Sequence, residues 1–169
     1  MLKRPTTPPH LKEFTEFLAA FNKESERGSV LIAMSMIEDM LGQIISSFLI
    51  DAPAVSRLLE GFNAPLGTLS ARSLCAFALG LLSEDEYREC DHLRKIRNEF
   101  AHHIHTSFKD QAIKDHCKNL RLAIKNGDPK SRSYVRSLFI TSAVCLILNL
   151  TNRAAYAKKE RLSQPEWPY

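Results

Sequence analysis

Length, composition and charge describe an ordinary globular chain. Its 169 residues suffice for one domain with a buried core, and 44% hydrophobic with 25% charged residues is the composition of a soluble protein. The N-terminal segment lacks the apolar stretch of a signal peptide, so we expect a cytoplasmic protein. The net charge of +4 is uneven, because residues 88–136 hold twelve Lys and Arg against six Asp and Glu. Such a segment either attracts polyanions or is only a solvated surface.

The first fifty residues predict a flexible lead and two helices. Residues 1–9 are rich in Pro and Thr, and apolar side chains at three- and four-residue spacings predict a helix over about residues 10–23. Ser25 or Ser29 can cap a second helix, which runs to about Ile50 and is apolar on nearly all sides. Two acids at its centre argue against a membrane span, so we expect this helix in the middle of a bundle.

The middle of the chain contains three further helix starts. Pro53 suits the first turn of a short helix, and Thr68 or Ser70 can cap the next one. Ser83 followed three residues later by Glu86 is a capping-box pattern, which predicts that another helix begins directly after Ser83.

The last third of the chain predicts two more helices and a tail. Ser107 can cap a helix that ends at the turn over residues 126–129, and a final helix is expected over about residues 130–159. The inward stripe of the first of these helices is Ile113, Cys117, Leu120 and Ile124. The apolar run in the final helix has only fourteen residues, which is too short to span a membrane. We predict an all-α helical bundle of about six to seven helices, with one domain over residues 10–162 and a tail over residues 163–169.

The four cysteines are scattered singly, without a C-x-x-C pair. In a chain that is not exported, such cysteines are expected to be reduced and buried, and not to form disulfides or bind zinc. The sequence therefore predicts neither a metal nor a cofactor.

One arginine falls among the apolar residues of the stretch "LRKIRNEFAHHIH", residues 93–105. On a helical wheel, Leu93, Ile96 and Phe100 define the buried face, and Arg97 lies about 40° from Leu93. A buried guanidinium without a partner is costly. Arg97 must therefore pair with a carboxylate, or open onto a cleft or subunit interface that admits an anion.

Glu38 and Asp39 are the candidate partners of Arg97, because they are the only acids between Glu26 and Asp51. They lie on the helix that must pass through the core. An ion pair between Arg97 and Glu38 would fix the register of two helices, and removing one member of a buried pair costs about 3–5 kcal/mol.

Asn98 and His102 lie four residues apart and share one stripe of their helix. Arg97 and His102 are about 140° apart around an ideal helix. They meet at one ligand only if the helix ends or distorts between them, or if two subunits bring their copies together. His103 and His105 add donors, but no carboxylate or cysteine completes a local metal site.

The spacing Arg97-Asn98-x-x-x-His102 resembles the R-x4–6-H motif of the HEPN superfamily, whose members are helical and commonly dimeric bundles. The resemblance implies a metal-independent endoribonuclease as an alternative function. The 2′-hydroxyl of RNA would attack the adjacent phosphate, with His102 as general acid or base. Arg97 would brace the developing charge, and Asn98 would orient the histidine or the phosphate.

A longer resemblance covers about residues 26 to 105. The segments "ERGSVLIAMSMIEDMLGQIISSFL" and "APLGTLSARSLCAFALGLLSEDEY" are similar to the mannitol operon repressor family of bacterial regulators. This resemblance implies control of transcription. The sequence shows no evident helix-turn-helix motif, so we expect action through a protein partner and do not expect direct reading of DNA.

We favour the regulator, because it rests on the longer resemblance and does not require Arg97 to meet His102. A homodimer and a protein partner are expected, while RNA is a partner only under the ribonuclease alternative, and no membrane is expected. Trp167 and Tyr169 in the tail either dock on a partner or belong to a packed or loose terminus.

Overall fold

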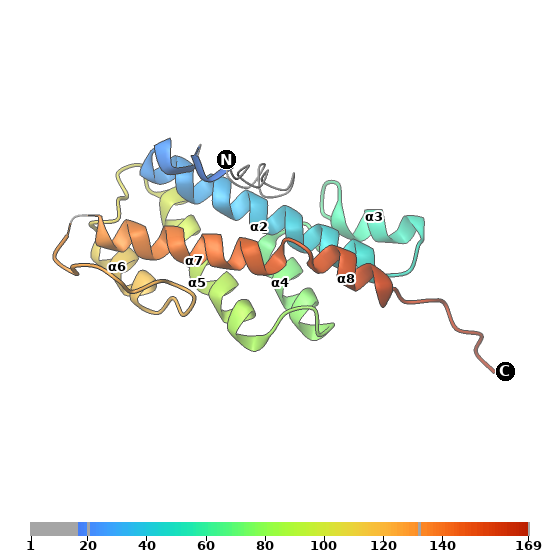
Figure 1. Ribbon diagram of the computed structural model, residues 1–169. Helices are drawn as coiled ribbons and strands as arrows, with labels where there is room; N and C mark the ends of the chain where they lie inside the picture. Colours follow the sequence, from blue (N-terminus) through green and yellow to red (C-terminus); the bar gives the residue numbers. More distant parts are fainter. Residues whose placement is uncertain (1–16, 20, 132, 169) are drawn as a thin grey trace, which may run out of the picture.

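Helices form the whole framework of the chain (Figure 1). The computed structural model describes residues 17–19, 21–131 and 133–168, and this part contains no strand. The order is α2 (Glu26–Phe48), α3 (Pro53–Leu59), α4 (Leu69–Ala78), α5 (Glu84–His102), α6 (Gln111–Lys118), α7 (Tyr134–Leu150) and α8 (Arg153–Lys159). The prediction of an all-α bundle of six to seven helices is confirmed.

Helix α2 is the central element, because it packs against α3, α4, α5, α7 and α8. Helices α2 and α7 run side by side along the bundle, with α5 packed against both (Figure 1). Two stretches, Glu26–Phe48 and Tyr134–Lys159, are long and apolar enough to cross a membrane by length and composition alone. Core helices of soluble proteins pass the same test, and both stretches contribute buried side chains to this core.

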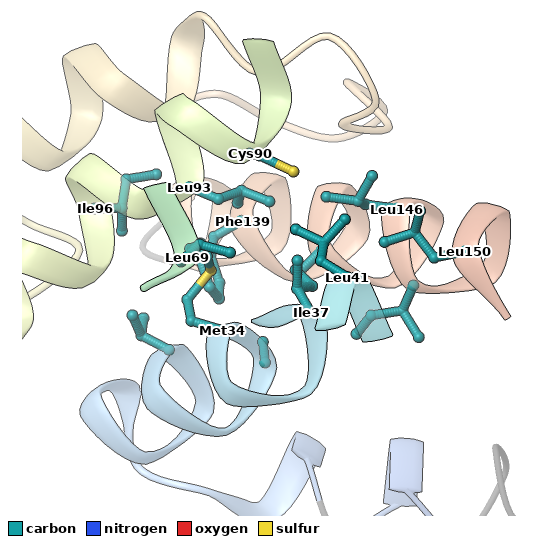
Figure 2. Close-up of a cluster of buried hydrophobic side chains, with 14 of the residues drawn as sticks. Met34, Ile37, Leu41, Leu69, Cys90, Leu93, Ile96, Phe139, Leu146 and Leu150 are labelled. Carbon is teal, nitrogen blue, oxygen red and sulfur yellow. The ribbon is translucent and has the colours of Figure 1, made fainter. Parts of the chain in front are cut away.

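The core lies where α2, α5 and α7 meet (Figure 2). Its fully buried residues include Met34, Ile37, Leu41, Leu93, Ile96, Phe139 and Leu146. Burying one such side chain contributes about 1.5–3 kcal/mol, so this cluster supplies much of the driving force for folding.

Three of the predicted helix caps are confirmed. The side chain of Ser25 accepts a hydrogen bond from the backbone N–H of Gly28, and the side chain of Thr68 accepts one from Ala71. Ser83 and Glu86 form the complete capping box at the start of α5. These caps involve atoms within one turn of the chain, and local sequence is therefore sufficient to predict them.

Two boundaries near the C-terminal end differ from the prediction. Helix α6 begins at Gln111 and ends at Lys118, so it is shorter than the helix expected between Ser107 and the turn over residues 126–129. Ile113, Cys117 and Leu120 are buried as predicted, but Ile124 lies beyond the helix and is 51% exposed. The final helix is interrupted between α7 and α8 by a turn over residues 151–152.

The remaining predictions concern the two ends of the chain. Of the helix expected over residues 10–23, the described positions 17–19 and 21–23 are helical, and the others lie outside the described residues together with the lead over residues 1–9. The C-terminal segment extends away from the bundle after α8 (Figure 1). In this segment Trp167 is 74% exposed, and Tyr169 lies outside the described residues.

The four cysteines are free thiols. Burial raises the pKa of Cys90 and of Cys117 to about 12, so both remain protonated near neutral pH. A protonated, buried thiol is a poor nucleophile and metal ligand. Cys90 and Cys117 therefore serve as small core residues.

Candidate functional site

Helix α5 carries the candidate site, and both of its ends are fixed. The capping box closes its first turn, while Cys90, Leu93, Ile96 and Phe100 anchor its inner face in the core. At its other end, the guanidinium of Arg27 on α2 donates to the backbone carbonyl of Phe100, and also to those of residues 103 and 104, at 2.6 and 2.9 Å. Helix α5 is thereby held in one orientation relative to α2.

Arg97 and Asn98 lie together on the wall of a pocket with a volume of about 370 Å³. The Nη1 atom of Arg97 donates to Oδ1 of Asn98 at 3.2 Å. We call this cavity the arginine pocket; its lining residues are Glu38, Gly67, Thr68, Leu69, Ser70, Arg94, Arg97 and Asn98. From the sequence, Arg97 was expected either to pair with a carboxylate or to open onto a cleft or subunit interface. In the structure it lies on the wall of a cleft.

The two acids considered as partners of Arg97 are separated by the fold. Glu38 lines the arginine pocket, whereas Asp39 lines a different pocket beside Arg72. Among the described residues, Arg97 forms no ion pair within 4.0 Å, so neither acid neutralises it directly. Glu38 and Arg97 therefore face one cavity as separate charges.

Arg97 was expected to connect its helix to α2 through Glu38, but Arg72 on α4 makes a connection to α2 at this residue. Its Nη1 atom donates to the backbone carbonyl of Glu38 at 2.9 Å, and its other nitrogens donate to the carbonyls of Leu59 and Leu66 at 2.9 and 2.8 Å. One side chain thereby ties α4 to α2, to the end of α3 and to the loop after it. Sequence reasoning missed this role, because backbone carbonyls far along the chain leave no signal in the sequence.

Arg94 lines the arginine pocket one turn before Arg97 and is anchored by an acid. Its Nη2 atom lies 2.7 Å from Oδ1 of Asp91, and Nζ of Lys95 lies 2.8 Å from Oδ2 of the same carboxylate. Burial raises the pKa of Asp91, but hydrogen bonds from Lys95 and Arg94 outweigh it and hold that pKa below its ordinary value. The single negative charge of Asp91 is thus shared by two cations, Arg94 and Lys95, so a net positive charge remains beside the pocket.

His102 is the last residue of α5, is exposed and lies outside the arginine pocket. It lines another cavity together with His103 and His105. Nε2 of His103 is 3.7 Å from Oε2 of Glu99, and the described residues contain no group of three side chains suited to a metal ion. The structure thus brings Arg97 and Asn98 together, but it does not bring His102 to the same pocket.

Acidic neighbours offset part of the basic segment over residues 88–136. Arg88 pairs with Glu84, Arg121 pairs with Asp85, and Lys118 lies 3.0 Å from Asp115. Two of these acids precede the segment, so the local excess of charge in the sequence overstates the charge of the folded surface. Such exposed pairs contribute little to stability.

Comparison with known proteins identifies similar sequences and structures. A family model described as "Mannitol repressor" matches residues 16–141, which includes every residue that lines the arginine pocket. A comparison with curated proteins found no match. A chain in the "X-ray structure of the MtlR-HPr complex from Escherichia coli" shares 22% sequence identity at a TM-score of 0.56, and the alignment covers 85% of this chain and 97% of that chain. At this identity the likeness shows a shared fold.

Proposed function

Because the chain belongs to the mannitol repressor family, we propose that it regulates transcription by binding a protein partner. The observation that carries this proposal is the family match over residues 16–141, which includes the central helix α2 and the whole of α5. The sequence contains no evident helix-turn-helix motif, which favours a contact with another protein over direct DNA recognition. A homodimer, expected from the sequence, remains part of the proposal.

HPr is the partner that we propose. The fold matches a chain from a structure of an MtlR–HPr complex, and the alignment covers nearly all of that chain. A rigid surface favours the docking of a partner, since preorganisation lowers the entropic cost of binding. The long-range contacts of Arg27 and Arg72 provide such rigidity by fixing α4 and α5 to α2.

Isothermal titration calorimetry with HPr from the same organism tests this proposal. We expect a saturable complex with a dissociation constant of roughly micromolar order, which is typical of transient regulatory contacts. A control titration uses an unrelated protein of similar size. A gel-shift assay with operator DNA should show no specific complex with the protein alone. Absence of saturable heat with HPr, together with sequence-specific DNA binding, would contradict the proposal.

The ribonuclease alternative receives no support from the geometry of a single chain. Its mechanism requires Arg97 and His102 at one phosphate, and within one chain they line different cavities. General acid–base catalysis requires the histidine within hydrogen-bond reach of the reacting group. We therefore do not assign this activity to the chain.

A further inference from the structure

Arg97 differs from the arginines whose side chains connect distant parts of the chain. Arg27 and Arg72 donate to backbone carbonyls, and Arg153 forms two hydrogen bonds with the carboxylate of Glu86. Among the described contacts, half-buried Arg97 has only the single hydrogen bond to Asn98. Arg97 lines the arginine pocket, and its remaining N–H donors have no partner among the described residues, so its guanidinium is available to an anion.

Further hydrogen-bond donors line the arginine pocket from α4 and α5. Arg94 and the amide of Asn98 belong to α5, and the hydroxyl groups of Thr68 and Ser70 lie at the start of α4. The Thr68 oxygen accepts a hydrogen bond from Ala71, which leaves its hydroxyl hydrogen free to donate elsewhere. Donors that come from two helices suit an oxyanion with several oxygens, and a phosphate group has more of them than a carboxylate.

Glu38 adds the opposite chemistry to the arginine pocket. In the described part of the chain, its carboxylate forms no ion pair and no side-chain hydrogen bond; only its backbone carbonyl is used, by Arg72. A carboxylate repels a bare anion, but it accepts hydrogen bonds from hydroxyl groups. A ligand that satisfies both parts of the pocket therefore carries a phosphate beside hydroxyl groups.

We propose that the arginine pocket binds a phosphorylated polyol, with the phosphate on Arg97 and Arg94 and a hydroxyl group on Glu38. The pocket volume of about 370 Å³ lies within the range of small-molecule sites. Such a ligand would act as an effector of the regulator. This role as an effector rests on the proposed regulatory function, but the binding itself is measured with the protein alone and does not depend on the complex with HPr.

Calorimetric titrations with three probes test the ligand class. The probes are a hexitol phosphate (mannitol 1-phosphate), inorganic phosphate, and mannitol. We expect the hexitol phosphate to bind most tightly, inorganic phosphate to bind more weakly, and mannitol to give no saturable heat. No saturable binding of either phosphate probe, or binding of mannitol equal to that of its phosphate, overturns the proposal.

Substitutions at three residues assign the binding to the pocket. Arg97→Met should weaken both phosphate probes by roughly tenfold or more, because a charge-assisted hydrogen bond is lost. Arg88→Met, on the same helix but exposed and paired with Glu84, is the matched control and should leave affinity unchanged. Glu38→Gln should strengthen inorganic phosphate binding and reduce the advantage of the hexitol phosphate, because it removes a repelling charge and a strong acceptor.

Circular dichroism separates loss of binding from loss of fold. If Arg97→Met does not fold, Arg97→Lys replaces it, and we expect weaker but measurable phosphate binding because lysine keeps the charge and loses the planar fork. The assignment of phosphate binding to the arginine pocket is contradicted if a folded Arg97 variant binds the phosphate probes as tightly as wild type. It is also contradicted if Glu38→Gln binds inorganic phosphate less tightly than wild type. None of these outcomes bears on the complex with HPr.

Discussion

Single polar residues hold the helices of this chain in register. Glu89 is completely buried on α5, and its carboxylate accepts from the backbone N–H groups of Arg121 and Leu122 at 2.8 and 3.1 Å and from the hydroxyl of Ser142 at 2.5 Å. These bonds attach the segment after α6 to α5 and α7. A buried carboxylate without a cation is stable only when several donors surround it, and here three are present.

Replacement of Glu89 by alanine should strongly destabilise the fold. Two buried N–H groups and one hydroxyl would lose their acceptor, and a hydrogen bond to a charged group contributes about 1.5–3 kcal/mol. We expect the free energy of unfolding to fall by at least about 3 kcal/mol, as measured by urea denaturation. Glu84→Ala, at an exposed ion pair on the same helix, is the control and should cost less than about 1 kcal/mol. Similar losses in the two variants would contradict this role of Glu89.

Helix α5 is the element that joins the core to the candidate site. Its inner face packs into the core, while Arg94, Arg97 and Asn98 line the arginine pocket. Its acidic first turn suits the positive end of the helix dipole. Loss of the capping interactions at the start of α5 is therefore expected to weaken the helix that carries the pocket residues.

Ser83→Ala should weaken α5 at its first turn. The hydroxyl accepts from the N–H of Glu86 at 3.3 Å, and the loss of a serine cap costs about 0.5–2 kcal/mol. Thermal unfolding followed by circular dichroism should show a lower midpoint. Ser83→Asp is the control, because it keeps a capping oxygen and should remain close to wild type. A midpoint for Ser83→Ala equal to that of Ser83→Asp would show that the cap contributes nothing.

Two carboxylates with lowered pKa values make part of the stability of the bundle dependent on pH. Burial raises the pKa of Glu86, but hydrogen bonds from Arg153 and Ser83 outweigh it, so the pKa lies below its ordinary value. The same net direction holds for Asp91 beside Lys95 and Arg94. Both carboxylates bind protons more readily in the unfolded chain than in the folded one. Their contribution to stability is therefore complete at pH values above their pKa in the unfolded chain, and it is lost as the pH falls through their pKa in the folded protein.

Stability should therefore decrease on acidification from about pH 5 to about pH 3, where carboxylates titrate. Urea denaturation at several pH values measures this slope. Glu86→Gln should lower stability at neutral pH and flatten the slope, because the titrating member of the pair with Arg153 is gone. Arg153→Met, which removes the cation, should flatten it in the same range. A slope in both variants equal to that of wild type would contradict the assignment to this pair.

Local patterns were sufficient for most helix starts and for the family. The caps at Ser25, Thr68 and Ser83 form within one turn, and the apolar periodicity of α5 shows which of its faces is buried. The end of α6 was not predictable in this way. Ile124 continues the apolar spacing of that helix, but the chain turns away before reaching it. Tertiary contacts, such as those from Glu89, fix the path of this segment.

The helical wheel placed Arg97 on the inward side of α5, and the structure finds it half-buried on a pocket wall. The groups that face Arg97 depend on tertiary packing. Helix α4 packs against α5 and brings Thr68 and Ser70, some thirty residues earlier in the chain, to the same cavity. The distance between Arg97 and Glu38 likewise depends on how two helices pack. Periodicity along one helix defines directions around its axis, whereas a site between helices is defined by distances across them, and those arise only from the packed core.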